Sequence, residues 1–358
     1  MGPRERVKAA VARLPLDKVP KGELGIERGL RQILLRRWGY AAGSLSEREE
    51  TWIVMQRLGM DLMGVEPVFP PRQHLGKDRR GREIRIDFWG NEAAFVGEAA
   101  AVARPACRTW EEFKEYVLPA PEHVDFRAVE EWQAGPFFTF LLLPGPFGLM
   151  TAIARGENVL LWLAAYEREV QKIAEKFSAW LVSLVRRGLA ARADGVMLME
   201  DLAGTGGLFM APGVWRRVFS PFIASLAAEV RRHGAVCFFH SDGDIRGILD
   251  SLAETGVDGI HSLEPASGMD LEWLKREYGK KFCLMGNIDC HYLLPCGTPQ
   301  EVKEATRRAL STGAAGGGFI LSSAAGVLAA DWPPENVEAM YLTAEGWDPA
   351  REASPLDQ

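Results

Sequence analysis

The sequence predicts an α/β protein, a (β/α)8 or TIM barrel with a helical and hairpin elaboration toward the N-terminus. Beyond about residue 135, short apolar runs alternate with amphipathic stretches, the pattern of repeated βα units in a parallel sheet. Two further candidate strands upstream bring the strands to eight, the number that closes such a barrel. The 47% hydrophobic and 25% charged residues are ordinary for a folded globular chain. We expect one domain over residues 1–358.

From residue 137 onward, each predicted strand is a short, mainly apolar run, as expected for strands buried on both faces. The predicted strands are residues 18–24, 60–65, 137–143, 195–200, 236–240, 259–263, 282–286 and 318–323. Helices are expected over residues 27–38 and 46–58, between the first strands. The stretch 166–189 carries apolar residues at helical spacing, which we interpret as packing against the sheet.

The alternation breaks between residues 66 and 135. Residues 81–97 have the pattern of a β-hairpin, and a helix is expected over residues 109–118. No linker rich in Pro, Gly or Ser separates this segment from its surroundings. We therefore predict a lid-like insertion over one mouth of the barrel rather than a second domain.

Charge and cysteine content exclude several classes of protein. The net charge is −6 and no long basic run is present, so we expect no nucleic-acid partner. No apolar run is long enough to span a membrane, and the charged N-terminus lacks the apolar core of a secretory signal. A cytoplasmic location is expected. The five cysteines form no CxxC pair, which favours reduced thiols over disulfides.

Functional residues of such a barrel lie at the carboxyl ends of the strands and on the loops beyond them. This rule selects as candidates Glu23, Phe147, Glu200, Asp201, His240, Asp242, Glu264, Asn287, Asp289, Cys290, Ser322 and Ser323. The alternative for any single acidic residue after a strand is that it caps the next helix. Several carboxylates converging on one mouth would repel one another unless a metal, a cation or a protonated member compensates them.

His240 ends an apolar strand, so its ring is expected at the barrel rim. Zinc binds histidine nitrogen together with carboxylate or thiolate ligands, and His240 with Glu264 or Asp242 could provide such ligands. We interpret His261, in the middle of the next strand, as a core histidine with a satisfied ring. The remaining histidines singled out by position, at residues 74, 123 and 233, are given no role.

Four stretches together resemble the uroporphyrinogen decarboxylase superfamily. They are residues 195–222, 238–279, 284–310 and 316–340, and they include the runs "MEDLAGTGG", "FFHSDGD", "HSLEP" and "LMGNIDC". The resemblance is specific from about residue 190 to 345 and implies the same barrel. The superfamily includes decarboxylases and cobalamin-dependent methyltransferases.

The resemblance favours the methyltransferase branch. Decarboxylases of the superfamily carry an N-terminal Arg-Gln-Ala-Gly-Arg motif, which the corresponding "KGELGIERGLRQ" lacks. Coenzyme M methyltransferases are similar in using a zinc site of His-x-Cys and a later Cys. Here His240 matches the histidine, whereas Asp242 and Ala325 stand where the two cysteines would be. A thiol as methyl acceptor is therefore disfavoured, and oxygen-rich coordination of zinc is expected.

These implications lead to a functional prediction. The chain is predicted to move a methyl group from a small methoxylated or N-methylated compound to cobalamin carried by a corrinoid-binding partner protein. His240, Asp242 and Glu264 would act as zinc ligands or as a proton-donating network, while Glu23, Phe147, Asp201, Asn287 and Asp289 would bind the substrate. The alternatives are a decarboxylase and a binding protein that has lost its chemistry. Assembly as a homodimer is compatible with all three.

Overall fold

The computed structural model describes residues 1–41, 45–96 and 99–347. Eight parallel strands form one sheet in the order β1-β3-β8-β9-β12-β13-β14-β15. A parallel bridge between Lys21 and Leu321 joins the last strand to the first and closes the barrel. The strands are β1 (Gly22–Glu23), β3 (Leu62–Val65), β8 (Phe138–Pro144), β9 (Gly195–Met199), β12 (Val236–His240), β13 (Gly259–Ser262), β14 (Cys283–Ile288) and β15 (Phe319–Ser323). The predicted (β/α)8 barrel is confirmed.

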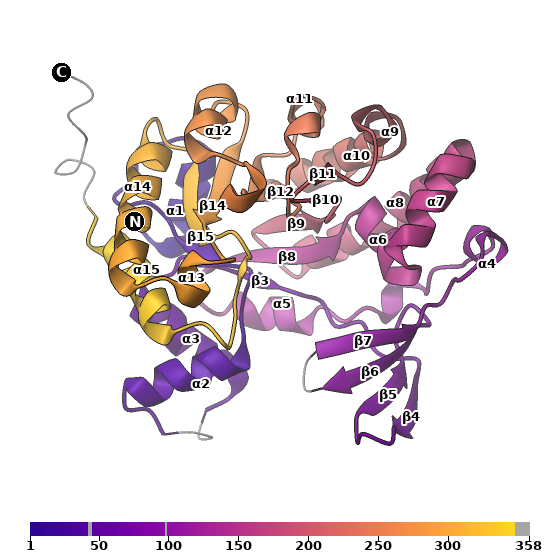
Figure 1. The fold of residues 1–358 in the computed structure, drawn as a ribbon, viewed down its shortest axis with the longest axis horizontal. Coiled ribbons are helices and arrows are strands. Elements are labelled where there is room, and N and C mark those ends of the chain that lie inside the picture. Colours follow the sequence, from indigo (N-terminus) through magenta and orange to yellow (C-terminus); the bar gives the residue numbers. More distant parts are fainter. Residues whose placement is uncertain (42–44, 97–98, 348–358) are drawn as a thin grey trace.

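Helices cover the outside of the barrel, and several connections hold more than one (Figure 1). They are α2 (Arg28–Arg37), α3 (Glu47–Leu58), α6 (Pro146–Ile153), α7 (Gly156–Ala165), α8 (Glu167–Ala190), α9 (Pro212–Val218), α10 (Ser220–Arg232), α11 (Leu249–Ala253), α12 (Leu271–Tyr278), α13 (Leu293–Cys296), α14 (Pro299–Ala314) and α15 (Pro334–Glu345). Short pieces are the strands β2 (Gly25–Ile26), β10 (Ala203–Gly204), β11 (Gly207–Leu208) and β16 (Val327–Leu328), and the 3-10 helices η2 (Arg246–Ile248) and η3 (Pro265–Ser267). No helix in the described part of the chain combines the length and apolar character that a membrane crossing requires.

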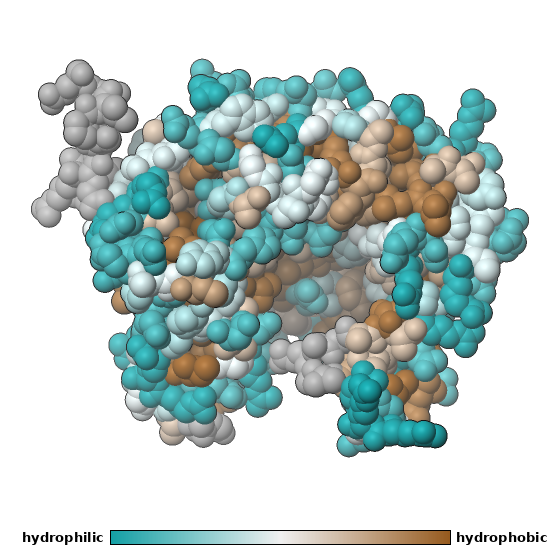
Figure 2. All heavy atoms as spheres, viewed as in Figure 1, coloured by the Kyte–Doolittle hydropathy of each residue, from teal (hydrophilic) through white to brown (hydrophobic). Residues whose placement is uncertain are grey.

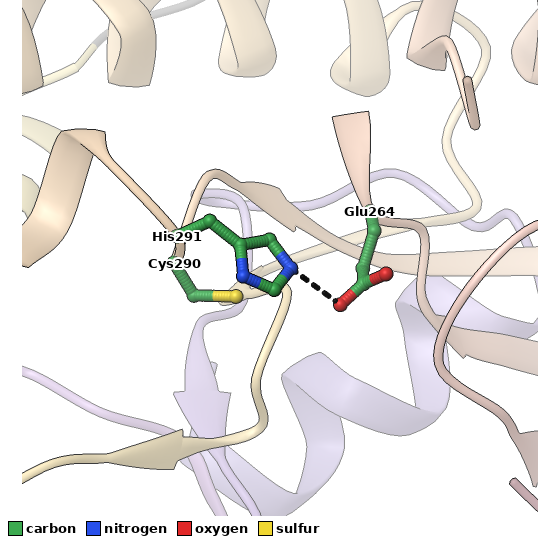
Figure 3. Close-up of side chains that lie close together, drawn as sticks. All are labelled: Glu264, Cys290 and His291. Carbon is green, nitrogen blue, oxygen red and sulfur yellow. Dashed lines mark hydrogen bonds and ion pairs between the residues drawn. The ribbon is translucent and has the colours of Figure 1, made fainter. Parts of the chain in front are cut away.

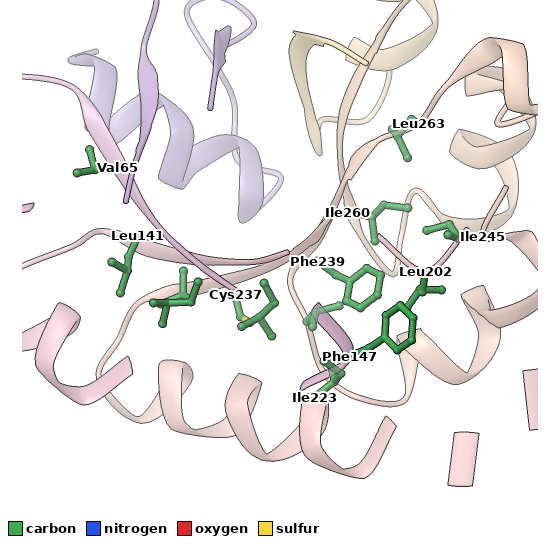
Figure 4. Close-up of a cluster of buried hydrophobic side chains, with 14 of the residues drawn as sticks. Val65, Leu141, Phe147, Leu202, Ile223, Cys237, Phe239, Ile245, Ile260 and Leu263 are labelled. Atoms are coloured by element: carbon green, nitrogen blue, oxygen red, sulfur yellow. The ribbon is translucent and has the colours of Figure 1, made fainter. Parts of the chain in front are cut away.

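The alternation of side chains along each strand builds two apolar layers. In β8, Phe138, Phe140 and Leu142 point into the barrel and join its interior cluster, whereas Leu141 and Leu143 join the outer cluster under the helices. Figure 4 shows part of this outer layer between strands and helices. Both faces of the strands are therefore buried, which explains why the strands read as continuous apolar runs.

Helix α1 (Pro3–Val11) closes the N-terminal end of the barrel. Its Val7 and Ala10 are fully buried and pack with Phe138 and Ile320 of the barrel interior. The opposite end, where the carboxyl ends of the strands lie, is left for the functional site.

The segment between β3 and β8 forms a second, antiparallel sheet. Its strands are β4 (Gln73–Lys77), β5 (Glu83–Ile86), β6 (Glu92–Val96) and β7 (Ala99–Arg104), followed by α4 (Trp110–Lys114), η1 (Pro121–His123) and α5 (Arg127–Trp132). The predicted hairpin corresponds to β5 and β6, apart from residue 97, which lies outside the described residues. The side chain of Asn91 donates a hydrogen bond to the carbonyl of Ala152, and the backbone of Cys107 forms an isolated parallel β-bridge with that of Ala154. This sheet therefore packs beside the end of α6.

Candidate active site

Polar side chains from neighbouring strands gather at the carboxyl end of the barrel. Asp201 follows β9, His240 ends β12, Asp242 follows it, and Glu264 follows β13. The strands pair in the order β9, β12, β13 and β14, so their ends lie next to one another along the rim. The face drawn in Figure 2 is hollowed near its centre, beside the antiparallel sheet of strands β4 to β7.

His240 lies between two carboxylates. Its Nε2 atom is 3.2 Å from an oxygen of Asp201 and 3.8 Å from an oxygen of Asp242. The imidazole is buried, with 4% of the side chain exposed, whereas the Asp201 and Asp242 side chains are 62% and 49% exposed. Burial is the largest single influence and would raise the pKa of Asp201, but the hydrogen bond and charge of His240 together with the backbone N–H of Asp242 lower the pKa overall. Burial raises the pKa of Asp242.

The other nitrogen of His240 contacts a second, fully buried histidine. The Nδ1 atoms of His240 and His261 are 2.7 Å apart, and the rings stack with an angle of 28° between their planes. Burial lowers the pKa of His261 well below its ordinary value, so this ring is neutral. Our interpretation of His261 as a core histidine with a satisfied ring is therefore half right: Nδ1 is paired, but Nε2 has no partner among the described residues.

This contact decides which nitrogens carry the protons. A buried N–H without an acceptor is costly, so the single proton of His261 belongs on Nδ1, where it donates to Nδ1 of His240. His240 is then protonated on Nε2 and donates toward Asp201. The arrangement is that of a proton donor facing the mouth.

The same contact bears on zinc binding by His240. A metal-bound histidine almost always donates its other ring N–H to an acceptor. If Nε2 of His240 held zinc, Nδ1 would have to donate to His261, and the proton of His261 would move to its unpartnered, buried Nε2. The cluster of Asp201, His240 and Asp242 has enough ligand atoms for a metal, but the histidine pair disfavours one there.

Glu264 belongs to a different cluster. One of its oxygens, Oε1, is 2.9 Å from Nε2 of His291, and the sulfur of Cys290 lies within 4.8 Å of ligand atoms of both residues. The three side chains point toward one another (Figure 3). Among the described residues, no group of potential ligands contains both His240 and Glu264, the pair that we predicted as zinc ligands.

Two predicted substrate contacts, Glu23 and Phe147, are buried rather than exposed at the mouth. The carboxylate of Glu23 is fully buried and accepts hydrogen bonds from Ser322, Ser323 and Tyr341. Burial raises the pKa of Glu23 to about 7. Phe147, labelled in Figure 4, is 2% exposed. Its ring packs edge-on against Phe219 in the outer core. This burial argues against the predicted stacking of Phe147 on a substrate.

Asn287 and Asp289 order the loops beside the mouth. The amide nitrogen of Asn287 donates to the carbonyls of Leu263 and Met269, which ties the end of β14 to the loop after β13. Asp289 accepts hydrogen bonds from the backbone N–H groups of residues 292 and 293. Asp289 therefore holds the loop before α13 by local hydrogen bonds, which is the alternative to substrate binding.

Sequence reasoning assigned no role to Cys290, His291 or Glu200. Cys290 and His291 follow directly after Asp289, just beyond the end of β14. The rule that selects residues at strand ends could therefore have pointed to His291 as well. Glu200 ends its strand buried, and one of its oxygens accepts from the N–H of Gly148 near the start of α6. Burial raises the pKa of Glu200 to about 8. Burial likewise raises the pKa of the Cys290 thiol to about 12.

Histidines, carboxylates and a thiol gather where the parallel strands of this barrel end. This arrangement is typical of α/β-barrel proteins that bind a ligand at the carboxyl end of the barrel. The comparison with known families identifies the particular group. Residues 136–347, more than half of the chain, match the model of uroporphyrinogen decarboxylase (URO-D), and the chain belongs to this family. The predicted superfamily is confirmed.

Two similar proteins are methyltransferases. A methylated-thiol–coenzyme M methyltransferase of Methanosarcina mazei is 24% identical over 203 residues, 57% of this chain. The chain spans about half, 51%, of the length of that curated relative. A solved structure of a methyltransferase from Methanosarcina mazei aligns with 96% of this chain and 98% of its own, with a TM-score of 0.71 and 17% identity. At this identity the likeness shows a shared fold.

Proposed function

We propose that the chain is a methyltransferase that moves a methyl group from a small methoxylated or N-methylated compound to a corrinoid protein. The observation that carries the proposal is the environment of His240, a buried imidazole whose Nε2 faces two exposed carboxylates at the barrel mouth. Family membership and the methyltransferase relatives support the same reaction class.

The chemistry needs a proton at the departing atom. An ether oxygen or amine nitrogen is a poor leaving group, and protonation as the methyl departs lowers the barrier. His240 would donate a hydrogen bond from Nε2 to the leaving atom when that atom takes the place of the Asp201 oxygen. The proton itself would come from solvent, because a ring whose Nδ1 accepts from His261 would be left as an imidazolate if it lost its Nε2 proton. The methyl group passes to the reduced cobalt of the partner's corrinoid, and the leaving atom keeps its electron pair and gains the proton.

The remaining residues would tune this step. His261 donates to Nδ1 of His240 and so holds the ring in the tautomer that is protonated on Nε2. Asp242 accepts a hydrogen bond from Ser262, which leaves its other oxygen available to a substrate cation or hydroxyl. The pairing of His240 with His261 disfavours zinc at His240, so the hydrogen bond to the leaving atom would come from the imidazole itself.

A decarboxylase acting on a polycarboxylate receives less support. Such a substrate needs cationic side chains at the mouth. Among the described residues, the ion pairs of Asp201, Asp242 and Glu264 are formed only with histidines. The acidic mouth would instead favour a neutral or cationic methyl donor.

The test is a methyl-transfer assay with reduced cobalamin, in which methoxyaromatics, methylamines and betaines are offered in turn. We expect at least one class to give methylcobalamin, and His240→Ala to lower the rate about 100-fold or more, the range found when a hydrogen-bond donor to developing negative charge is removed. His233→Ala, a change on the surface at the end of α10, is the matched control. Full activity of His240→Ala, or turnover of uroporphyrinogen alone, would refute the proposal.

A further inference from the structure

We propose that Glu264, Cys290 and His291 form a zinc site, with its thiolate supplied from the end of β14. The proposal concerns metal binding alone, and it holds whether or not the chain transfers methyl groups. It places the metal on the rim between β13 and β14, not at His240.

The donor set is one that zinc prefers. Zinc binds thiolate sulfur at about 2.3 Å and imidazole nitrogen or carboxylate oxygen at about 2.0–2.2 Å, and three protein ligands plus one open position are typical of catalytic sites. Ligands at these lengths around a tetrahedral ion lie about 3.3–3.7 Å from one another. The three donor atoms lie within 4.8 Å of one another, and the nitrogen of His291 is 2.9 Å from the oxygen of Glu264, so small side-chain movements suffice.

Glu264 is already oriented for this role. Its Oε2 atom accepts hydrogen bonds from the N–H of Gly243, at 3.0 Å, and from the hydroxyl of Ser267, at 2.7 Å. The other oxygen, Oε1, is the one that faces His291. The carboxylate is buried, with 7% of the side chain exposed. The hydrogen bonds to Oε2 therefore fix the orientation of the carboxylate and leave Oε1 in position to bind a metal.

The loop that carries the other two ligands is also held in place. Asp289 accepts hydrogen bonds from backbone N–H groups after His291, and Asn287 ties the end of β14 to the loop that follows Glu264. The side chain of His291 is 54% exposed and Cys290 is partly buried, so the site is open to solvent on the imidazole side. A metal could enter there, and its fourth position could take an oxygen, nitrogen or sulfur atom of a ligand.

The thiolate distinguishes this cluster from the one at His240. Asp201, His240 and Asp242 offer only oxygen and nitrogen, and zinc binding there would leave a buried N–H of His261 without an acceptor. The cluster at Glu264 contains a sulfur donor and an imidazole with no competing histidine partner in the described residues. The soft thiolate ligand and a histidine that is not paired with a second histidine both favour zinc binding at the Glu264 cluster.

Zinc affinity of the purified full chain tests the proposal. Metal content would be measured after gel filtration, and the dissociation constant by competition with a chromophoric chelator. We expect about one zinc per chain, and a loss of affinity of about 100-fold or more in Cys290→Ser and in His291→Ala, because changes outside the ligand shell already cost 10–100-fold. Replacement of zinc by cobalt(II) should give a thiolate-to-cobalt absorption band that Cys290→Ser abolishes.

Matched controls separate this site from the alternatives. Cys296→Ser removes an exposed thiol from the same stretch of chain, and His240→Ala removes the other candidate ligand; both should keep the zinc and the cobalt band. Circular dichroism verifies that each variant is folded, and the exposed His291 offers a second variant if Cys290→Ser is unstable. Zinc absent from the parent protein, retained by both Cys290→Ser and His291→Ala, or lost on His240→Ala would overturn the proposal.

Discussion

His240 and His261 share one hydrogen bond between their Nδ1 atoms, so the proton on one ring determines the tautomer of the other. The buried ring of His261 takes the position nearer the barrel interior, and its neutrality follows from burial. The nitrogen of His240 that faces the mouth therefore carries an N–H to donate. A single contact between two side chains, 21 residues apart in the chain, sets the chemistry available to His240.

Buried acids beside the mouth make stability depend on pH. The pKa of Glu200 rises from 4.5 to about 8 through burial, so the folded state keeps a proton that the unfolded chain releases above pH 4.5. Its stabilising contribution is complete below that pH and is lost as the pH rises through about 8, by at most about 5 kcal/mol. We expect Glu200→Gln to flatten the fall in melting temperature between pH 5 and pH 8.

Thermal melts across this pH range measure the effect. Glu254→Gln, which changes an exposed carboxylate on the surface, should leave the slope as in the parent protein. Glu23, with a pKa of about 7, adds its own slope to all three proteins. An unchanged slope in Glu200→Gln would show that this carboxyl is ionised in the folded chain.

Secondary-structure elements in the barrel follow closely from the sequence. The strand predicted at residues 236–240 is observed as Val236–His240, and the helix predicted at 27–38 as Arg28–Arg37. The strand is buried on both faces and the helix on one face. Each arrangement gives a recognisable spacing of apolar residues along the sequence. The strand Gln73–Lys77 was missed because all its side chains are exposed, and an exposed strand has no apolar alternation.

The ends of β13 and β14 are joined by a side chain, Asn287. Removing its amide leaves the carbonyls of Leu263 and Met269 without their donor. We expect Asn287→Ala to lower the free energy of unfolding by about 1–3 kcal/mol. Because this bond also positions the loop of Glu264, zinc affinity should fall by about 10-fold or more.

Urea unfolding and the chelator competition test both parts of this prediction. Asn158→Ala, a change near the start of α7, is a control for the loss of an amide. Unchanged stability and unchanged zinc affinity in Asn287→Ala would contradict this positioning role of Asn287.

At the scale of the molecule, the barrel is closed at its N-terminal end by α1. Arg6 of that helix forms a buried ion pair with Asp61, which directly precedes β3, and a second ion pair with the half-exposed Asp17. Asp61 also accepts from the N–H of Lys21. These contacts attach the first helix to the first two strands.

Breaking the buried pair should be costly. In Asp61→Ala the guanidinium of Arg6 stays buried with only Asp17 as an acidic partner, so we expect a loss of about 3–5 kcal/mol in unfolding free energy. Asp17→Ala removes the exposed partner of the same guanidinium and should cost about 1 kcal/mol or less. Equal losses in the two variants, measured by urea unfolding, would contradict the assigned roles.

The sequence by itself determined the eight strands, their parallel closure and the residues that reach the carboxyl rim, His240 and Glu264 among them. These features follow from local apolar patterns and from the rule that parallel strands end at one rim. Only the tertiary structure decided that His240 pairs with His261, that Glu264 faces His291 and Cys290, and that Phe147 is core. Such choices depend on side-chain packing between residues distant in the chain, which no local pattern records.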